Sequence, residues 1–437
     1  MTTASRRRLA RRLVPAVAGV AVAALALTGC SGGSAGSASG KGATTFTYFG
    51  TTENVTTPAV LKSLSTGACS AANKALPYKY DHIAQAQLDQ KLQLLAGQNA
   101  LATQFAAGGA PALTQSLLKS GQLKDLGPEL SKLGIEDDIL PAAQSSIKAL
   151  YGGKMDALPY EFNIEGFWYN KKLFADNGLD VPTTWDDLVS DAAVFKKAGL
   201  QPFATGASGQ GWPVTRLISG YLFRELGPTA MTDIRDGKAK LTDPKYVEAA
   251  AQVQKLGKAG YFGKAVGSVD YNTIVSQFLT GKAPMMYMGS WILSNFADKA
   301  QNKIGSDDIG FFAFPTVTGG AGSADQLPGN VGLPTGISAK LYNAKVGSWV
   351  KCIAKNYGST ALKEKGTISG FRVNTPVKTD PLTTIVQDRI ASTTTSVQWF
   401  EAFLSSKAST AAWNNVAQMV NGQMSAEQYM STVQAAQ

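Results

Sequence analysis

The sequence predicts an α/β protein, because short apolar segments of strand length alternate with longer segments of helical periodicity. The chain has 437 residues, of which 44% are hydrophobic, so it is long enough for two domains with buried cores. No internal repeat is visible. Strands that alternate with helices of this length are typical of α/β architecture.

Residues 1–29 predict a secretory signal peptide. Arginines precede an apolar run from Leu13 to Leu27, and this region contains no acidic residue. The run is shorter than the roughly 20 residues that a membrane-spanning helix needs. A retained transmembrane helix and a signal peptide without lipidation remain as alternatives, and the arginine pairs leave both Sec and twin-arginine export open.

The sequence Leu27-Thr28-Gly29-Cys30 resembles the lipobox of bacterial lipoproteins, in which the cysteine is acylated and becomes the first residue. Two acyl chains give stable membrane anchoring. Residues 30–43 then comprise the lipidated Cys30 and a tether rich in glycine, serine and alanine, which is expected to be a flexible coil. We therefore expect an exported protein that is held by lipid at the outer face of the cell membrane.

The charge balance and the motifs exclude several classes of function. The chain has 41 Lys and Arg against 31 Asp and Glu, but 36 basic and 31 acidic residues remain without residues 1–29, a net charge of +5. This balance does not indicate a nucleic-acid partner. His82 is the single histidine, and the sequence has no Walker loop, Cys-x-x-Cys, His-Glu-x-x-His or Gly-x-Ser-x-Gly motif. We expect no metal, no cofactor and no catalytic residues.

The predicted elements begin with a strand at residues 45–49. Residues 88–97 follow as part of a helix, because Leu88, Leu92 and Leu95 are spaced at i, i+4 and i+7 before a glycine. A capping box at residues 184–187 begins a later helix, which faces the core with Leu188, Ala192 and Phe195 and stops at Gly199.

Further helices and strands are predicted in the second half of the chain. A helix starts at Asp243 and Pro244, with Tyr246, Ala250 and Val253 on one face. Apolar runs at residues 284–288 and 309–314 read as strands. From Thr383 onward the pattern is mostly helical, with Trp413, Val416 and Val420 on one face and a second helix start at Ser425.

Two cysteines, Cys69 and Cys352, follow Cys30. An even number of cysteines in an exported chain favours a disulfide. Two separate buried thiols are the alternative, since a free cysteine packs like a small apolar residue.

The aromatic residues indicate a binding surface. The chain has 7 Trp, 14 Tyr and 18 Phe, and both Trp212 and Trp291 stand beside small residues in expected loops. Flat aromatic rings pack against the apolar faces of pyranose rings, and carboxylates and amides bind the hydroxyl groups. For each tryptophan, packing in the core is the alternative role.

Three stretches in order carry a family resemblance. They are residues 153–160 with 166–174 and 182–188, residues 278–291, and Phe314-Pro315 with residues 328–333. From about Thr44 onward the chain resembles the extracellular solute-binding proteins of ABC importers, in the family 1 carbohydrate group that includes maltose-binding protein. Residues 109–113 and 66–75 depart from this pattern, and the first departure removes an acidic residue that many relatives have.

The resemblance implies a two-lobed periplasmic-binding-protein fold of type II, with α/β lobes joined by a hinge of three crossings. The crossings are expected near Leu158, Phe312 and Gly370. Lobe 1 then comprises residues 44–157 and 315–369, and lobe 2 comprises residues 158–314 and 370–437. Both Cys69 and Cys352 fall in lobe 1, as a disulfide between them would require.

The resemblance also implies which residues bind a sugar in the cleft between the lobes. Trp291 matches the position most often stacked on sugar, and the other expected ligand-binding residues are Glu53, Glu161, Trp212, Asn330, Arg372 and Trp413. Surface charge is the alternative role for Glu53 and Glu161, and a structural turn is the alternative for Asn330.

The function implied is that of a monomeric lipoprotein that binds a mono- or oligosaccharide and delivers it to the permease subunits of an ABC importer. A glycan-acting hydrolase that uses Glu53 and Glu161 is one alternative. A sugar sensor on the same fold, without a transport role, is another.

Overall fold

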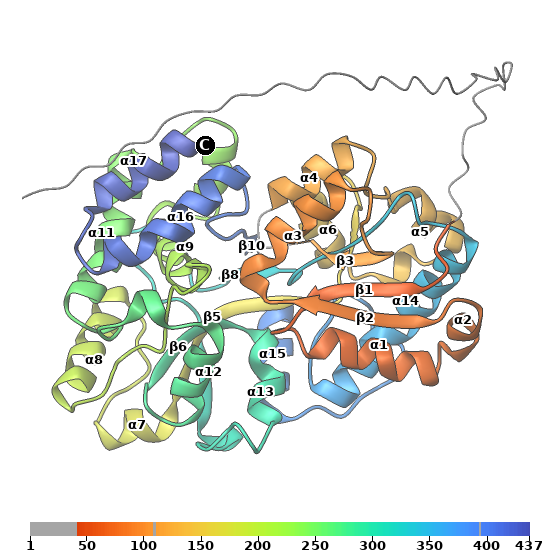
Figure 1. Cartoon of the computed structure of the whole chain (residues 1–437). Coiled ribbons are helices and arrows are strands. Elements are labelled where there is room, and N and C mark those ends of the chain that lie inside the picture. Colours follow the sequence, from red (N-terminus) through yellow and green to blue (C-terminus); the bar gives the residue numbers. More distant parts are fainter. Residues whose placement is uncertain (1–41, 108–110, 393–394) are drawn as a thin grey trace, which may run out of the picture. The chain divides into compact units, whose positions relative to one another are not determined.

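The computed structural model describes residues 42–107, 111–392 and 395–437, all within one compact unit, Lys41–Gln437. The predicted signal peptide, Cys30 and residues 31–41 of the tether lie outside the described residues. Strands and helices of the described part alternate along the chain, and the strands form two sheets (Figure 1). The predicted α/β class is therefore confirmed.

The first sheet has the strand order β2-β1-β3-β9-β4. Its strands are β1 (Phe46–Thr51), β2 (Tyr78–Ile83), β3 (Gln104–Ala106), β4 (Ala157–Leu158) and β9 (Thr335–Ile337). β1 runs parallel to β2 and β3, whereas β9 is antiparallel to β3 and β4. Parallel neighbours need long crossovers, and helices supply them here. The part of the chain built on this sheet is called the first lobe below.

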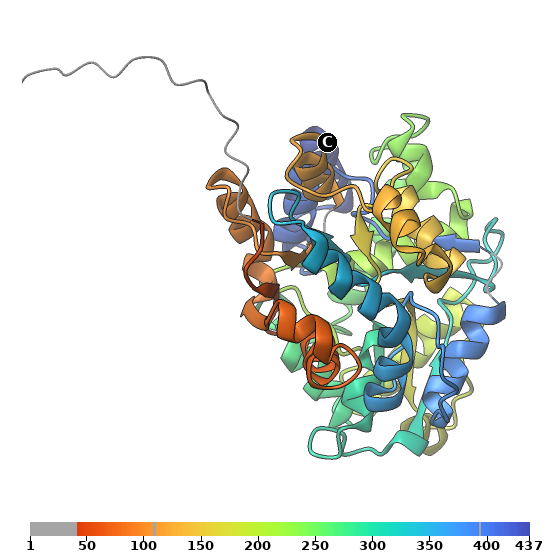
Figure 2. The ribbon, with the colours of Figure 1, turned by 90° about the vertical axis from the view of Figure 1, so that its right-hand side faces the viewer.

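The helices of the first lobe are α1 (Thr56–Thr66), α2 (Ser70–Ala75), α3 (Gln85–Gly97), α4 (Pro111–Lys119), α5 (Gly127–Leu133), η1 (Glu136–Asp138), α6 (Pro141–Leu150) and α14 (Ala344–Lys365). α14 packs beside α1, and Figures 1 and 2 show the two helices side by side. A disulfide joins Cys69, just before α2, to Cys352 on α14, with the two Cα atoms 5.7 Å apart.

The second sheet has the order β10-β8-β5-β6, and β7 also pairs with β5. Its strands are β5 (Asn163–Asn170), β6 (Met285–Gly289), β7 (Ile309–Phe312), β8 (Gln326–Asn330) and β10 (Thr395–Val397). β5 is antiparallel to β6, β7 and β8 and buried almost throughout, so it forms the centre of this sheet. The part of the chain built on this sheet is the second lobe.

The helices of the second lobe are α7 (Lys171–Asp176), α8 (Trp185–Lys197), α9 (Trp212–Leu226), α10 (Ala230–Arg235), α11 (Pro244–Lys258), η2 (Val266–Ser268), α12 (Tyr271–Leu279), η3 (Ser290–Ile292), α13 (Leu293–Ala297), η4 (Ser306–Asp308), α15 (Pro381–Ser392), α16 (Ser406–Val420) and α17 (Ala426–Ala436). None of the described helices is long and apolar enough to span a membrane.

The local sequence signals correspond to real helix ends. The Thr184 hydroxyl accepts a hydrogen bond from the Asp187 N–H at 3.1 Å, and the Asp187 carboxylate accepts one from the Thr184 N–H at 3.0 Å. This capping box begins α8, as predicted. α11 starts at Pro244, and a second capping box at Ser425 begins α17.

The second crossing lies later than expected. The sequence placed it near Phe312, but β8 still pairs with β5, in the register Asn163 to Asn330 and Ile164 to Gly329. The next strand, β9, belongs to the first sheet. The chain therefore passes between the sheets within residues 331–334, because β8 is held in the second sheet up to its last residue. The remaining lobe boundaries stay a prediction.

Candidate ligand-binding site

A cavity lies between elements of the two lobes. It has about 920 Å³ of empty space, counting the part that is open to solvent. The aromatic lining residues are Trp212, Tyr271, Trp291, Trp399 and Trp413, and the charged ones are Glu53, Glu161, Arg216 and Glu401. Asn54, Val55, Thr56, Gln85, Gln210, Ser294, Asn295, Asn330, Gly332 and Leu333 complete the lining.

Three aromatic side chains form a cluster on one wall. The rings of Trp212 and Trp291 meet edge to face with centroids 5.8 Å apart, and Tyr271 lies 6.2 Å from Trp212. Gly289 precedes this cluster, and any Cβ at that position would overlap the Trp291 indole. The glycine therefore allows Trp291 to fold back over the end of β6, which is the physical reason for the Gly-Ser-Trp sequence.

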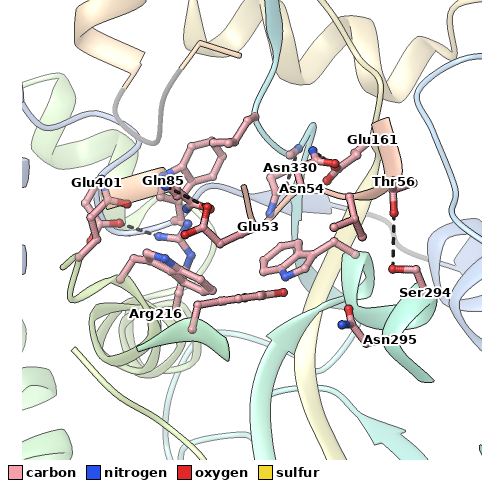
Figure 3. A pocket seen from close by; sticks show the side chains of 18 of the residues that line it. Glu53, Asn54, Thr56, Gln85, Glu161, Arg216, Ser294, Asn295, Asn330 and Glu401 are labelled. Atoms are coloured by element: carbon pink, nitrogen blue, oxygen red, sulfur yellow. Dashed lines mark hydrogen bonds and ion pairs between the residues drawn. The ribbon is translucent and has the colours of Figure 1, made fainter. Parts of the chain in front are cut away.

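The loop after β1 brings Glu53 and Asn54 to the cavity. The Glu53 carboxylate accepts a hydrogen bond at 2.9 Å from the backbone N–H of Gln85, at the start of α3 (Figure 3). An acidic side chain is favoured there because the first N–H groups of a helix have no intrahelical acceptor. Asn54 accepts from the Thr57 N–H at 3.0 Å and so stabilises the start of α1.

Glu161 lies between β4 and β5 and is nearly buried, with 8% of its surface exposed. Its two oxygens accept hydrogen bonds from the amides of Asn54, at 2.7 Å, and Asn163, at 3.1 Å. Burial raises the pKa of Glu161 above the usual value of a glutamate, and the two amides partly oppose this effect. A buried carboxylate held by amides can accept hydrogen bonds from a neutral polar ligand.

A buried ion-pair cluster forms the opposite end of the cavity. The Arg216 guanidinium lies 3.1 Å from the Glu165 carboxylate and 2.6 Å from that of Glu401. Trp212 and Trp399 flank it, with ring centroids 5.6 Å and 5.3 Å from its central carbon. Figure 3 shows Arg216 and Glu401 together, away from Glu161.

Further hydrogen bonds hold this cluster in place. Glu401 also accepts from the indole N–H of Trp413 at 2.9 Å and from the Thr215 hydroxyl. The Asn330 amide donates to Glu165 at 2.6 Å, and its carbonyl oxygen accepts from the Gly332 N–H at 2.8 Å. Asn330 is therefore both a turn residue and part of the cavity wall.

The two lobes contact each other at the side of the cavity that Thr56 and Ser294 line. The hydroxyl groups of Thr56, on α1, and Ser294, on α13, are 3.4 Å apart (Figure 3). These helices belong to the first and the second lobe respectively, so the cavity is bounded on this side by a direct contact between lobes.

Six of the expected ligand-binding residues line this one cavity, and they are Glu53, Glu161, Trp212, Trp291, Asn330 and Trp413. Arg372 does not. Its side chain donates to the carbonyl of Asp137, and its backbone N–H donates to that of Asp138 at 2.8 Å. The expected position of Arg372 is therefore corrected: the guanidinium is bound to η1 and does not reach the cavity.

Sequence reasoning missed Arg216, Tyr271, Trp399 and Glu401 as lining residues. One signal was available for Arg216, because it follows Trp212 by four positions and thus shares its helix face. No comparable signal marks Glu401, since its role depends on contacts with α9 and α16. Among the described residues, no group of three or more His, Cys, Asp or Glu side chains has the geometry to hold a metal ion.

The fold and the cavity define a class of protein with two α/β lobes and a ligand cavity between them. Residues 95–356, more than half of the chain, match the family described as bacterial extracellular solute-binding protein. The chain belongs to this family, as the sequence resemblance indicated.

Two curated relatives illustrate the similarity. A probable sugar-binding periplasmic protein of Mesorhizobium japonicum is 26% identical over 298 residues, covering 65% of this chain and 66% of that protein. A multiple sugar-binding protein of Streptococcus mutans is 30% identical over 201 residues, covering 44% of this chain and 45% of that protein. With other relatives, the matched part covers only 43% and 51% of their length.

Solved structures have the same architecture over most of the chain. A chitin oligosaccharide binding protein aligns with a TM-score of 0.79 and 25% identity, covering 90% of this chain and 98% of that one. SBP RafE in complex with raffinose aligns with a TM-score of 0.67 at 18% identity, which supports the fold alone. The expected two-lobed fold is thus confirmed.

Proposed function

We propose that this protein captures a carbohydrate in the cavity between its lobes and delivers it to the permease of an ABC importer. The observation that carries the proposal is the composition of the cavity, where Trp212, Trp291 and Trp413 accompany Glu53 and Glu161. Aromatic rings pack against the C–H faces of a sugar, and carboxylates and amides bind its hydroxyl groups. The sugar-binding relatives support the same ligand class.

A thermal-shift screen of the domain that begins after Cys30 tests the ligand class. The panel contains galactose, xylobiose, laminaribiose, raffinose and chitin oligosaccharides, with amino acids and short peptides as controls. A ligand that binds only the folded state raises the melting temperature by mass action. We expect a saturable shift with one class of sugar, confirmed by calorimetry. A shift with amino acids or peptides alone would contradict the proposal.

Binding without chemical change is a further part of the proposal. Glu53 and Glu161 line the same cavity, as a hydrolase would need, but both are held by hydrogen bonds from the protein. The protein should leave chromogenic glycosides intact during prolonged incubation. Turnover that disappears in both Glu53→Gln and Glu161→Gln would favour the hydrolase instead.

The cellular setting is proposed from the N-terminal sequence. Cys30 is expected to carry the lipid that holds the protein, as a monomer, at the outer face of the cell membrane. Metabolic labelling with a fatty acid should mark the native protein, and Cys30→Ser should abolish the label and release the protein from membranes. Deleting the neighbouring permease genes should stop uptake of the ligand, whereas a sensor would leave uptake intact.

A further inference from the structure

Arg216 has the only positive charge among the described residues that line the cavity. Arginine binds carboxylates and phosphates with two parallel N–H donors. A pocket arginine would therefore ordinarily suggest an acidic ligand, such as a uronic acid or a sugar phosphate. The surroundings of Arg216 decide whether it can act in that way.

Two carboxylates of the protein already form ion pairs with the guanidinium of Arg216. Nε faces Glu165 at 3.1 Å and Nη1 faces Glu401 at 2.6 Å. The side chains of both glutamates are almost fully buried, at 0% and 1% exposure, and that of Arg216 is 11% exposed. Because bulk water is largely excluded, these charges are weakly screened and the two carboxylates outweigh the single cation.

The other charged residues that line the cavity also make it more negative. Glu53 and Glu161 also line the cavity, and among the described lining residues no second cation balances them. Glu161 has amide partners, Asn54 and Asn163, which leave its charge in place when it is ionised. Burial raises the pKa of Glu165 as well, and the charge of Arg216 opposes this effect. Even with both Glu161 and Glu165 protonated, Glu53 and Glu401 against Arg216 leave a net charge of −1 around the cavity.

We propose that Glu165 and Glu401 determine the charge selectivity of the site: they neutralise Arg216, so that the cavity accepts neutral or cationic sugars and rejects sugars with a carboxylate or phosphate. The inference rests on the proposed function, because it assumes that this cavity receives the sugar. It assigns to Arg216 the role of a rigid part of the cavity wall whose N–H groups donate hydrogen bonds to hydroxyl groups of the ligand. Like charges that meet without water between them oppose binding strongly.

The first test compares ligands that share a ring and differ in charge. Calorimetry at low salt would use galactose, galacturonic acid and galactosamine, the glucose series, and the C6-oxidised form of any oligosaccharide that the thermal screen finds. We expect the acid to bind at least about tenfold more weakly than its neutral counterpart, since like-charge contacts oppose association strongly. Equal or tighter binding of the acid would overturn the proposal.

Single variants show which residues cause the discrimination against the acidic sugar. Glu401→Gln and Glu165→Gln each remove one negative charge beside Arg216 and should reduce the discrimination against the acid by about threefold or more, as expected for a buried charge pair. Glu427→Gln, on the exposed surface of α17, removes the same charge away from the cavity and should leave the ratio of the two affinities unchanged. An unchanged ratio in all three variants would overturn the assignment to Glu165 and Glu401.

A second test needs neither a ligand nor a variant. Trp168, Trp185 and Trp349 are buried in the cores, so a quencher reaches tryptophan mainly through the cavity. Quenching by iodide, caesium and acrylamide is measured relative to free N-acetyltryptophanamide. Iodide should be the least effective, and stronger relative quenching by iodide than by caesium would contradict the proposal. If no sugar binds, the proposed function fails and this measurement alone decides the charge of the cavity.

Discussion

At the scale of single residues, the cavity depends on side chains that the protein itself keeps in position. Trp291 lies over a glycine, Glu53 is held at the start of α3, and Glu401 accepts from Arg216 and Trp413. Polar groups that are already oriented lose less conformational freedom on binding. The site therefore presents fixed donors and acceptors between aromatic surfaces.

Trp291→Ala should weaken sugar binding by about 1 to 3 kcal/mol, the range for burying a large apolar side chain, because the ligand loses its stacking surface. Calorimetry measures the change. Trp291→Phe keeps an aromatic ring and should recover part of the affinity, while the melting temperature of the unliganded protein changes little in both variants. Unchanged affinity in Trp291→Ala would remove this residue from the site.

Asp156 allows the free-energy cost of a buried carboxylate charge to be tested at a place away from the cavity. Neither carboxylate oxygen has a hydrogen-bond partner among the described residues, and burial raises the pKa of Asp156 from 3.8 to about 6. The folded state thus binds this proton more tightly than the unfolded state, and the ionised group destabilises the fold increasingly as the pH rises from about 4 to 6.

Asp156→Asn should therefore raise the free energy of unfolding at pH 7 by about 1 to 3 kcal/mol, by linkage, and the gain should disappear near pH 4. Urea unfolding of both proteins at the two pH values measures it. An equal effect at pH 7 and pH 4 would show that packing, and not ionisation, causes the difference.

At the scale of elements, the site depends on how closely α9 and α16 pack. Gly211, just before α9, has φ −77°, so its backbone conformation suits any residue. A Cβ there would nevertheless overlap the side chain of Val416 and the backbone of Trp413 on α16. The small residue is needed for close approach, and this approach brings Trp413 to the cavity.

Gly211→Ala should destabilise the protein by about 1 to 3 kcal/mol, as expected for overpacking, and should also weaken ligand binding through the displacement of Trp413. Gly97→Ala, at the end of α3, is the matched control because a Cβ added there would have no neighbouring atom within 4 Å. It should be neutral or slightly stabilising. If Gly211→Ala behaves like the control, the close packing is not required.

At the scale of the whole protein, the lobes meet at one side of the cavity, so we expect ligand exchange to depend on their moving apart. The contact between Thr56 and Ser294 closes one side, with the two hydroxyl oxygens 3.4 Å apart. Closure of lobes around a ligand is a hinge motion in which a few segments change conformation. The segments that cross between the two sheets are the natural hinges.

A disulfide between Thr56→Cys and Ser294→Cys should lock this side. When the double variant is oxidised with ligand bound, release of the ligand should slow by at least about tenfold, because the new disulfide would prevent the lobes from moving apart. Stopped-flow fluorescence measures release, and reductant should restore the normal rate. The single Thr56→Cys variant is the control. Fast release from the fully oxidised protein would contradict the need for opening at this contact.

Local signals in the sequence were sufficient for the class of fold and for the starts of α8, α11 and α17. Thr184 and Ser425 cap their helices through contacts over three residues, and such short-range interactions do not depend on the rest of the chain. The strands predicted at residues 45–49, 284–288 and 309–314 also follow from local pattern, and they correspond to β1, β6 and β7. Trp212, Trp291 and Trp413 were found partly from small neighbours and partly from the family resemblance, whereas Trp399 was missed.

Only the tertiary structure decided which residues meet. Arg372 was expected at the ligand, but its side chain contacts η1. The second crossing lies after β8, because β8 is paired with β5 in the second sheet. Glu165, Arg216 and Glu401 come from distant parts of the chain, and their cluster forms when β5, α9 and the segment before α16 pack together. The sequence by itself determined the alternation of strands with helices and the aromatic and acidic character of the site, because these depend on local pattern and composition. Charge pairing in the cavity depends on long-range packing, which no local pattern records.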